Sequence, residues 1–153
     1  MQRKMPILEW YQLAKEGMAP PVRIQLSGNS MFPLIRHQRD YVTVISPDRP
    51  VSVGDIILLR EPGSGRYVMH RVWQLKEGRV LTWGDNCEAP DGWYPMEDIW
   101  GKVVLIERGG KKIEPDARKG LRWAKFWHQA GKVWRLYEKY RNGLARRINK
   151  LKA

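Results

Sequence analysis

The chain has 153 residues and a formal net charge of +12 at pH 7. This length is typical of one domain with its own buried core. A single cysteine, Cys87, excludes an intramolecular disulfide and suits a reducing compartment. No apolar run approaches the roughly 18 residues that a membrane-spanning helix needs, so no transmembrane segment is predicted.

The positive charge is concentrated in the last quarter of the chain. Between Asp116 and Ala153 there are 12 Lys and Arg against 2 Asp and Glu, a net charge of +10. The remaining 115 residues therefore carry a net charge of only +2. The basic character thus belongs to the C-terminal segment, where it predicts an anionic partner.

The predicted elements begin with a short amphipathic helix over residues 6–17, which ends at Gly17. Pro20 and Pro21 follow and cannot continue a helix. The next 85 or so residues alternate with period two or form short β-branched runs between turn signals. The predicted strands cover residues 22–26, 41–45, 55–59, 67–73, 80–83 and 100–106. Many short strands at this spacing indicate a mainly β body that is closed or folded in a barrel-like manner.

After a predicted turn at residues 109–112, the pattern changes to that of a helix beyond Pro115. Apolar residues recur there at alternating three- and four-residue steps and trace one face, formed by Trp123, Trp127, Ala130, Trp134, Tyr137, Leu144, Ile148 and Leu151. The chain therefore divides into an N-terminal helix and connector (1–21), a β domain (22–108) and a basic amphipathic tail (109–153). His37 and His128 are expected at the surface.

Three interpretations of the tail remain open. A cationic helix with tryptophans on one face suits an anionic membrane surface, which is the favoured interpretation. The apolar face could instead pack on the β body. Binding of nucleic acid through the positive charge is the least favoured of the three.

Three short motifs supply a candidate nucleophile, a candidate base and candidate acids. They are Ser27-Gly28-Asn29-Ser30-Met31-Phe32-Pro33, then Met69-His70-Arg71-Val72, then Gly84-Asp85-Asn86 followed by Asp91. Acyl transfer needs these roles together, because a free serine hydroxyl is a poor nucleophile at neutral pH. Each motif alone is common in turns or strands, but the three in this order indicate a hydrolytic site.

The first motif resembles the nucleophile segment of type I signal peptidases and of the related LexA-like autoproteases. In those families the serine directly before methionine attacks the peptide. Residues 53–60 and 67–72 resemble two further strands of the same families, the second of which carries the base. Most bacterial members have lysine as the base. His70 resembles instead the branch found in endoplasmic-reticulum and archaeal signal peptidases and in some from Gram-positive spore formers.

The resemblance assigns Ser30 as the nucleophile and His70 as the general base. Neutral imidazole accepts a proton near neutral pH, whereas a lysine base requires strong desolvation to do so. In the histidine branch the aspartate five residues after the asparagine completes a Ser-His-Asp arrangement, which favours Asp91 over Asp85 as the residue that orients His70. Oxyanion or positioning roles are assigned to Gly28, Asn29 and Met31. No metal and no cofactor are implied.

The resemblance implies a LexA- or signal-peptidase-like fold and a serine endopeptidase that cleaves a peptide or precursor protein through an acyl-enzyme. Two alternatives are a LexA-like self-cleaving regulatory domain and a non-catalytic binding module of the same fold. Because no anchor or export signal is recognised, we expect a cytoplasmic protein, peripheral on the inner membrane leaflet if the tail binds lipid.

Overall fold

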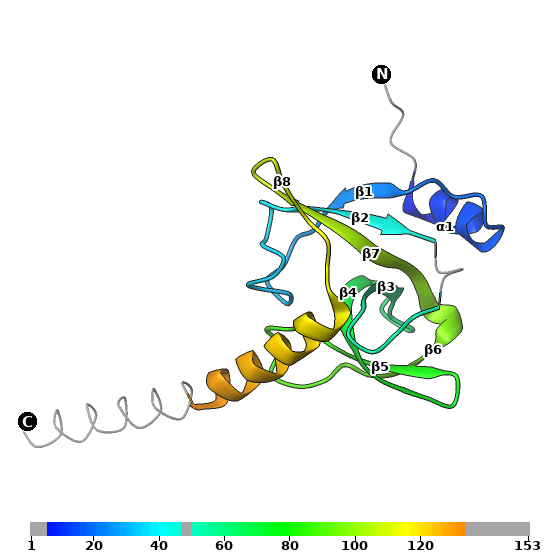
Figure 1. Cartoon of the computed structure of the whole chain (residues 1–153). Helices are drawn as coiled ribbons and strands as arrows, with labels where there is room; N and C mark the ends of the chain where they lie inside the picture. The colour runs from blue at the N-terminus through cyan, green and yellow to red at the C-terminus, as the bar shows by residue number, and fades with distance from the viewer. Residues whose placement is uncertain (1–5, 47–49, 134–153) are drawn as a thin grey trace, which may run out of the picture.

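The computed structural model describes residues 6–46 and 50–133. This part of the chain forms a helix at each end and one antiparallel sheet between them (Figure 1). The N-terminal helix is α1 (Ile7–Lys15), and the C-terminal helix covers residues 117–133. The remaining elements are β1 (Val22–Gln25), β2 (Tyr41–Ile45), β3 (Ile56–Arg60), β4 (Tyr67–Lys76), β5 (Arg79–Trp83), β6 (Gly92–Pro95), the 3-10 turn Met96–Asp98, β7 (Ile99–Arg108) and β8 (Lys111–Ile113).

The strands lie in the order β1-β2-β7-β3-β4-β5-β6, and β8 pairs with the C-terminal half of β7. All of the pairings are antiparallel. The prediction of a mainly β body is therefore confirmed. The predicted barrel-like closure is wrong for the described residues, because β1 and β6 lie at opposite ends of the order and do not pair.

The six predicted strands are present, but two further strands were not predicted. β6 has four residues and ends in Pro95, and a short segment with proline gives little strand signal. β8 lies in the region predicted as a turn at residues 109–112. The turn itself is formed by Gly109 and Gly110, both at positive φ, and Lys111 already belongs to the strand.

Strand β3 lies at the centre of the sheet and contributes to a core on each face. Ile56 and Leu58 belong to one apolar cluster, whereas Ile57 and Leu59 belong to the other. All four side chains are at most 2 % exposed. Successive side chains of a strand point to opposite faces of the sheet. A strand that is covered on both faces therefore has a continuous run of apolar residues in its sequence, as β3 has.

Helix α1 covers one of these faces. Its C-terminus has the hydrogen bonds of a Schellman motif, in which Gly17 N–H donates to Ala14 O at 3.1 Å and Met18 N–H donates to Leu13 O at 2.9 Å. Gly17 adopts φ +69°, so the predicted stop at this glycine is confirmed. Trp10 is 1 % exposed and its indole N–H donates to the carbonyl of the proline connector, at Pro20.

The C-terminal helix packs against the β body through small residues. A Cβ on Gly54 would lie 2.2 Å from the carbonyl oxygen of Ala117, and one on Gly120 would lie 2.5 Å from the Arg71 guanidinium. Further along, Ala124 is fully buried. The first turns of the helix therefore approach the body as closely as backbone atoms allow.

The predicted surface position of His128 is wrong. This residue of the C-terminal helix is 7 % exposed, and its ring lies 4.2 Å from the Trp83 ring and 5.3 Å from the Trp73 ring, measured between centroids. The prediction failed because a single polar residue such as histidine is expected at the surface, and the sequence pattern does not show that two tryptophans pack against its ring. His37 is exposed, as predicted.

The predicted apolar positions from Trp134 to Leu151 lie outside the described residues. Within the described residues, neither helix has the length and apolar character required to cross a bilayer.

Gly54→Ala should destabilise the protein more than Gly63→Ala. Both glycines have positive φ, but the space around Gly63 is open within 4 Å, whereas the Gly54 methyl would collide with the backbone of the C-terminal helix. We expect about 1 kcal/mol of strain from φ at either site and about 2 kcal/mol more at Gly54. Urea unfolding of both variants measures the difference. Equal losses would mean that the helix does not need this close approach.

Candidate active site

The first motif forms a compact turn that we call the Ser30 loop (residues 27–35). Met31 and Ile35 are 3 % and 2 % exposed and anchor the loop in the core. Two backbone hydrogen bonds close it, from Phe32 N–H to Asn29 O at 3.1 Å and from Ile35 N–H to Met31 O at 2.9 Å. Ser30 itself stays half-buried beside a cavity. The positioning role predicted for Met31 agrees with its place in the core.

Gly28 has φ +111°, a conformation that strongly favours glycine. Its N–H donates to His37 Nδ1 at 2.7 Å. That N–H is therefore already used, so Gly28 serves the shape of the loop rather than offering a donor to an oxyanion.

A second loop, the Asp85 loop (residues 84–87), holds the Ser30 loop in place. Asn86 N–H donates to the Ser30 carbonyl at 2.7 Å, and its side-chain amide donates to the Asn29 carbonyl at 3.2 Å. These two hydrogen bonds cross between segments far apart in sequence. Asn86 therefore fixes the backbone at Ser30, a role that the motif alone did not reveal.

The Asp85 loop is in turn held by a buried ion pair. Arg71 donates to both carboxylate oxygens of Asp85, at 2.8 and 2.7 Å, and its third nitrogen donates to Gly54 O at 2.8 Å. The two side chains are only 1 % and 2 % exposed. Asp85 is thus paired with Arg71, whereas the His70 ring contacts Asp91.

The contact predicted between His70 and Asp91 is present. His70 Nδ1 lies 2.5 Å from Asp91 Oδ2, and Thr82 Oγ1 donates to the same oxygen at 2.8 Å. His70 and Thr82 are 6 % and 0 % exposed. A carboxylate at neutral pH only accepts hydrogen bonds, so Nδ1 carries the proton and Nε2 of the neutral ring is left as an acceptor.

His70 Nε2 and Ser30 meet around Gly84. A Cβ on Gly84 would lie 2.9 Å from Nε2 and 2.8 Å from the Ser30 carbonyl oxygen, so these two atoms border one small space. Ser30, His70 and Asp91 also line one cavity of about 300 Å³. The structure thus brings together the three residues predicted as nucleophile, base and orienting acid.

The hairpin between β3 and β4 forms the opposite rim of this cavity, through Glu61 and Arg66. The hydrogen bond from Ser64 has the largest effect on Glu61 and lowers the pKa of its carboxyl group. Burial acts in the opposite direction, but a further hydrogen bond from Arg66 helps to hold this pKa below its usual value. The rim therefore carries a paired carboxylate at neutral pH. Tyr67 and Val68 add apolar surface beside it.

Cys87 also borders the space around Gly84, with Sγ 2.6 Å from the position of a Gly84 Cβ. Burial raises the pKa of the Cys87 thiol, and the negative charge of Asp91 raises it further. The thiolate is the nucleophilic form of cysteine. Cys87 is therefore a weak competitor of Ser30 for the role of nucleophile.

The far end of the Ser30 loop is fixed by Arg108. This residue pairs with both carboxylate oxygens of Asp40 and donates to Leu34 O at 2.7 Å. Burial acts to raise the pKa of Asp40, but the hydrogen bonds from Arg108 and from Arg36 N–H outweigh it, so this pKa is lowered. The resulting stabilisation is present above the pKa of an unfolded aspartate and is lost as the pH falls through the lower folded value.

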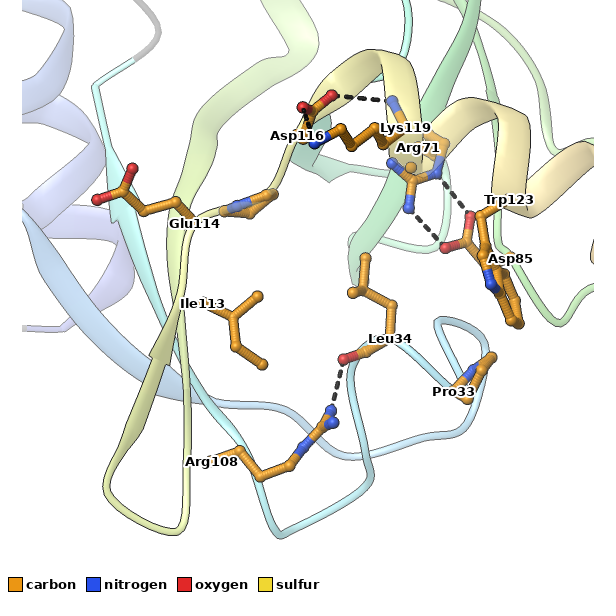
Figure 2. A pocket seen from close by; sticks show the side chains of 12 residues that line it. Pro33, Leu34, Arg71, Asp85, Arg108, Ile113, Glu114, Asp116, Lys119 and Trp123 are labelled. Carbon is orange, nitrogen blue, oxygen red and sulfur yellow. Dashed lines mark hydrogen bonds and ion pairs between the residues drawn. The ribbon is translucent and has the colours of Figure 1, made fainter.

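Figure 2 shows a second cavity, of about 350 Å³, between the Ser30 loop and the C-terminal helix. Pro33, Leu34, Ile113 and Trp123 provide most of its apolar wall. Three ion pairs hold most of the charged groups at its edge: Arg71 with Asp85, Arg108 with Asp40, and Lys119 with Asp116. This cavity therefore offers apolar surface and lies apart from the Ser30 cavity.

No protein-family model and no curated protein matches the chain. The site is therefore interpreted from its own geometry. Within residues 6–46 and 50–133, no three His, Cys, Asp or Glu side chains gather in a way that could hold a metal ion.

Asp85→Asn should reduce the free energy of unfolding by about 3 to 5 kcal/mol, because it leaves Arg71 buried without its ionic partner. Asp91→Asn is the matched control, since it removes one charge from a partly exposed carboxylate beside the cavity. We expect the control to unfold within about 1 to 2 kcal/mol of the parent. Chemical denaturation of the two variants gives the comparison, and an equal loss at both positions would contradict the assigned roles.

Proposed function

We propose that this chain is a serine endopeptidase that uses Ser30 as nucleophile, His70 as general base and Asp91 as the residue that orients the base. The observation that carries the proposal is the contact of 2.5 Å between His70 Nδ1 and Asp91, in a cavity that Ser30 also lines. Few other chemistries require a buried imidazole fixed by a carboxylate beside a serine.

In the proposed reaction, His70 Nε2 takes the proton of Ser30 Oγ while Oγ bonds to the scissile carbonyl carbon. The negative charge that develops on the carbonyl oxygen is stabilised by backbone donors, of which Ser30 N–H is the first candidate. The tetrahedral intermediate then breaks its C–N bond, and the imidazolium gives its proton to the leaving amine. Water, activated by the same base, hydrolyses the ester and restores Ser30.

The resemblance to type I signal peptidases and LexA-like proteins supports a peptide or precursor protein as the substrate. The histidine branch of that resemblance agrees with His70 and Asp91 at their positions in the sequence. Self-cleavage and a purely binding role use the same residues and fold, so activity has to be measured to separate them.

A fluorophosphonate probe should label the full-length chain at Ser30, because an activated serine attacks phosphorus as it attacks a carbonyl. Ser30→Ala and His70→Ala should each lower the rate of labelling by at least about a thousandfold, and the double variant should be no worse than either, since the two act as one unit. Intact-mass and peptide-mass analysis locate the adduct.

Ser27→Ala is the matched control, because Ser27 lies three residues earlier in the same loop and is exposed. It should label at the parental rate. Labelling that persists in Ser30→Ala, or that moves to Cys87, would contradict the proposed nucleophile. Cleavage of the chain itself during incubation would favour the self-cleaving alternative.

Thr82→Val should slow the labelling of Ser30, because Thr82 Oγ1 donates to the Asp91 oxygen that contacts His70 Nδ1. Without this hydrogen bond Asp91 is held less firmly against the imidazole, and we expect a labelling rate up to about tenfold lower. Thr82→Ser should restore the parental rate, and an unchanged rate in Thr82→Val would exclude a role of Thr82 in holding Asp91.

A further inference from the structure

The C-terminal helix presents three different faces over residues 117–133. One face is packed on the β body and contains Ala124 and His128, which are 0 % and 7 % exposed. The predicted apolar stripe of this helix runs along a different face. Packing on the body therefore accounts for the small residues of the helix and leaves most of its large apolar residues uncovered.

The second face is apolar and exposed. Trp123, Phe126 and Val133 are 45 %, 64 % and 66 % exposed, and their spacing of three and seven residues places them on one side of a helix. Trp123 stacks on Trp127 with ring centroids 5.2 Å apart. A face of this kind costs free energy in water unless another apolar phase covers it.

This apolar face continues onto the Ser30 loop. The Trp127 ring lies 6.4 Å from the ring of Phe32, in an edge-to-face arrangement, and Phe32 is 40 % exposed. Trp123 also forms part of the wall of the apolar cavity in Figure 2. We call the surface formed by Phe32, Trp123, Phe126, Trp127 and Val133 the aromatic surface.

The third face of the helix is cationic. Residues 117–133 include five Lys and Arg and no Asp or Glu, and all five basic residues are exposed: Arg118, Lys119, Arg122, Lys125 and Lys132. At 100° per residue, four of them fall on an arc directly beside the aromatic surface, and Lys119 falls within the apolar arc near the start of the helix.

We infer that the aromatic surface and its cationic border dock on an anionic lipid bilayer. Aromatic side chains enter the boundary between head groups and acyl chains, and adjacent Lys and Arg pair with anionic head groups. A nucleic acid duplex would use the cations but leave the exposed apolar side chains in water. Because Phe32 follows Ser30 by two residues, docking in this way holds the Ser30 loop at the lipid surface.

Binding of the full-length chain to vesicles tests this inference. Sedimentation with vesicles of phosphatidylcholine that contain about 30 % phosphatidylglycerol, an anionic lipid, should pellet the chain. Vesicles of phosphatidylcholine alone should bind at least about tenfold more weakly, and added salt should weaken binding to the anionic vesicles. Ser30→Ala serves as the parent for all measurements, so the result is independent of catalysis.

Two pairs of variants separate the apolar and the cationic contributions. Phe126→Ala should weaken binding about tenfold, whereas Leu8→Ala, which removes another exposed apolar side chain on α1, should have no effect. Arg122→Gln should weaken binding about fivefold, whereas Lys76→Gln at an exposed position of β4 should not. These substitutions lie at exposed positions, and the unfolding midpoints of the variants verify that the fold is kept.

Three results would overturn the inference. They are equal binding to neutral and anionic vesicles, equal losses in the control variants, and absence of vesicle binding together with tight, salt-sensitive binding of duplex DNA. The last result would assign the cationic face to nucleic acid instead. Fluorophosphonate labelling is measured separately, with Phe126→Ala and Arg122→Gln introduced into the chain that keeps Ser30. Loss of vesicle binding with intact labelling in those chains would leave the proposed peptidase in place, because the two measurements use different residues.

Discussion

The buried ion pair of Arg71 and Asp85 is the interaction on which the rest of the site depends. Burying two charges costs free energy, and here the cost is offset by two hydrogen bonds between the side chains and a third to Gly54 O. The pair joins strand β4 to the Asp85 loop, and the first turns of the C-terminal helix pack on Arg71 through Gly120. One guanidinium therefore connects the strand that carries His70, the loop that holds Ser30 and the helix with the aromatic surface.

Much of the strand pattern and the identity of the candidate residues could be predicted from the sequence. Ser30, His70 and Asp91 lie in three short motifs that indicate one chemistry only in combination, and the pairing of the strands brings His70 and Asp91 together. The choice between Asp91 and Asp85 needed the structure, because both lie in the same short segment. It depends on which of them Arg71 neutralises, and a sequence does not give that pairing.

The buried face of the C-terminal helix could not be predicted in the same way. Hydrophobic periodicity ranks residues by apolar bulk, so it traced the face that contains the tryptophans and gave no signal for the face that packs on the body. The helix instead packs on the body at Gly120 and Ala124, whose small side chains allow the helix to approach closely. Close packing of backbones therefore determines the buried face, and the size of the apolar side chains does not. His128 lies on the same buried face and packs against the rings of Trp73 and Trp83. The short strands β6 and β8 were missed because each depends on a neighbour that supplies its hydrogen bonds.

The pairing register of β4, β5 and β6 determines at which stage of folding His70 and Asp91 can come into contact. Val72 of β4 pairs with Thr82 of β5, and Thr82 pairs with Gly92 of β6, which places His70 and Asp91 side by side. A slip of one residue at either pairing would turn these side chains to opposite faces of the sheet. His70 and Asp91 therefore meet only after β6 has joined the sheet. A chain still leaving the ribosome carries Ser30 long before it carries Asp91, so the order of synthesis keeps a nascent molecule from having the complete proposed site.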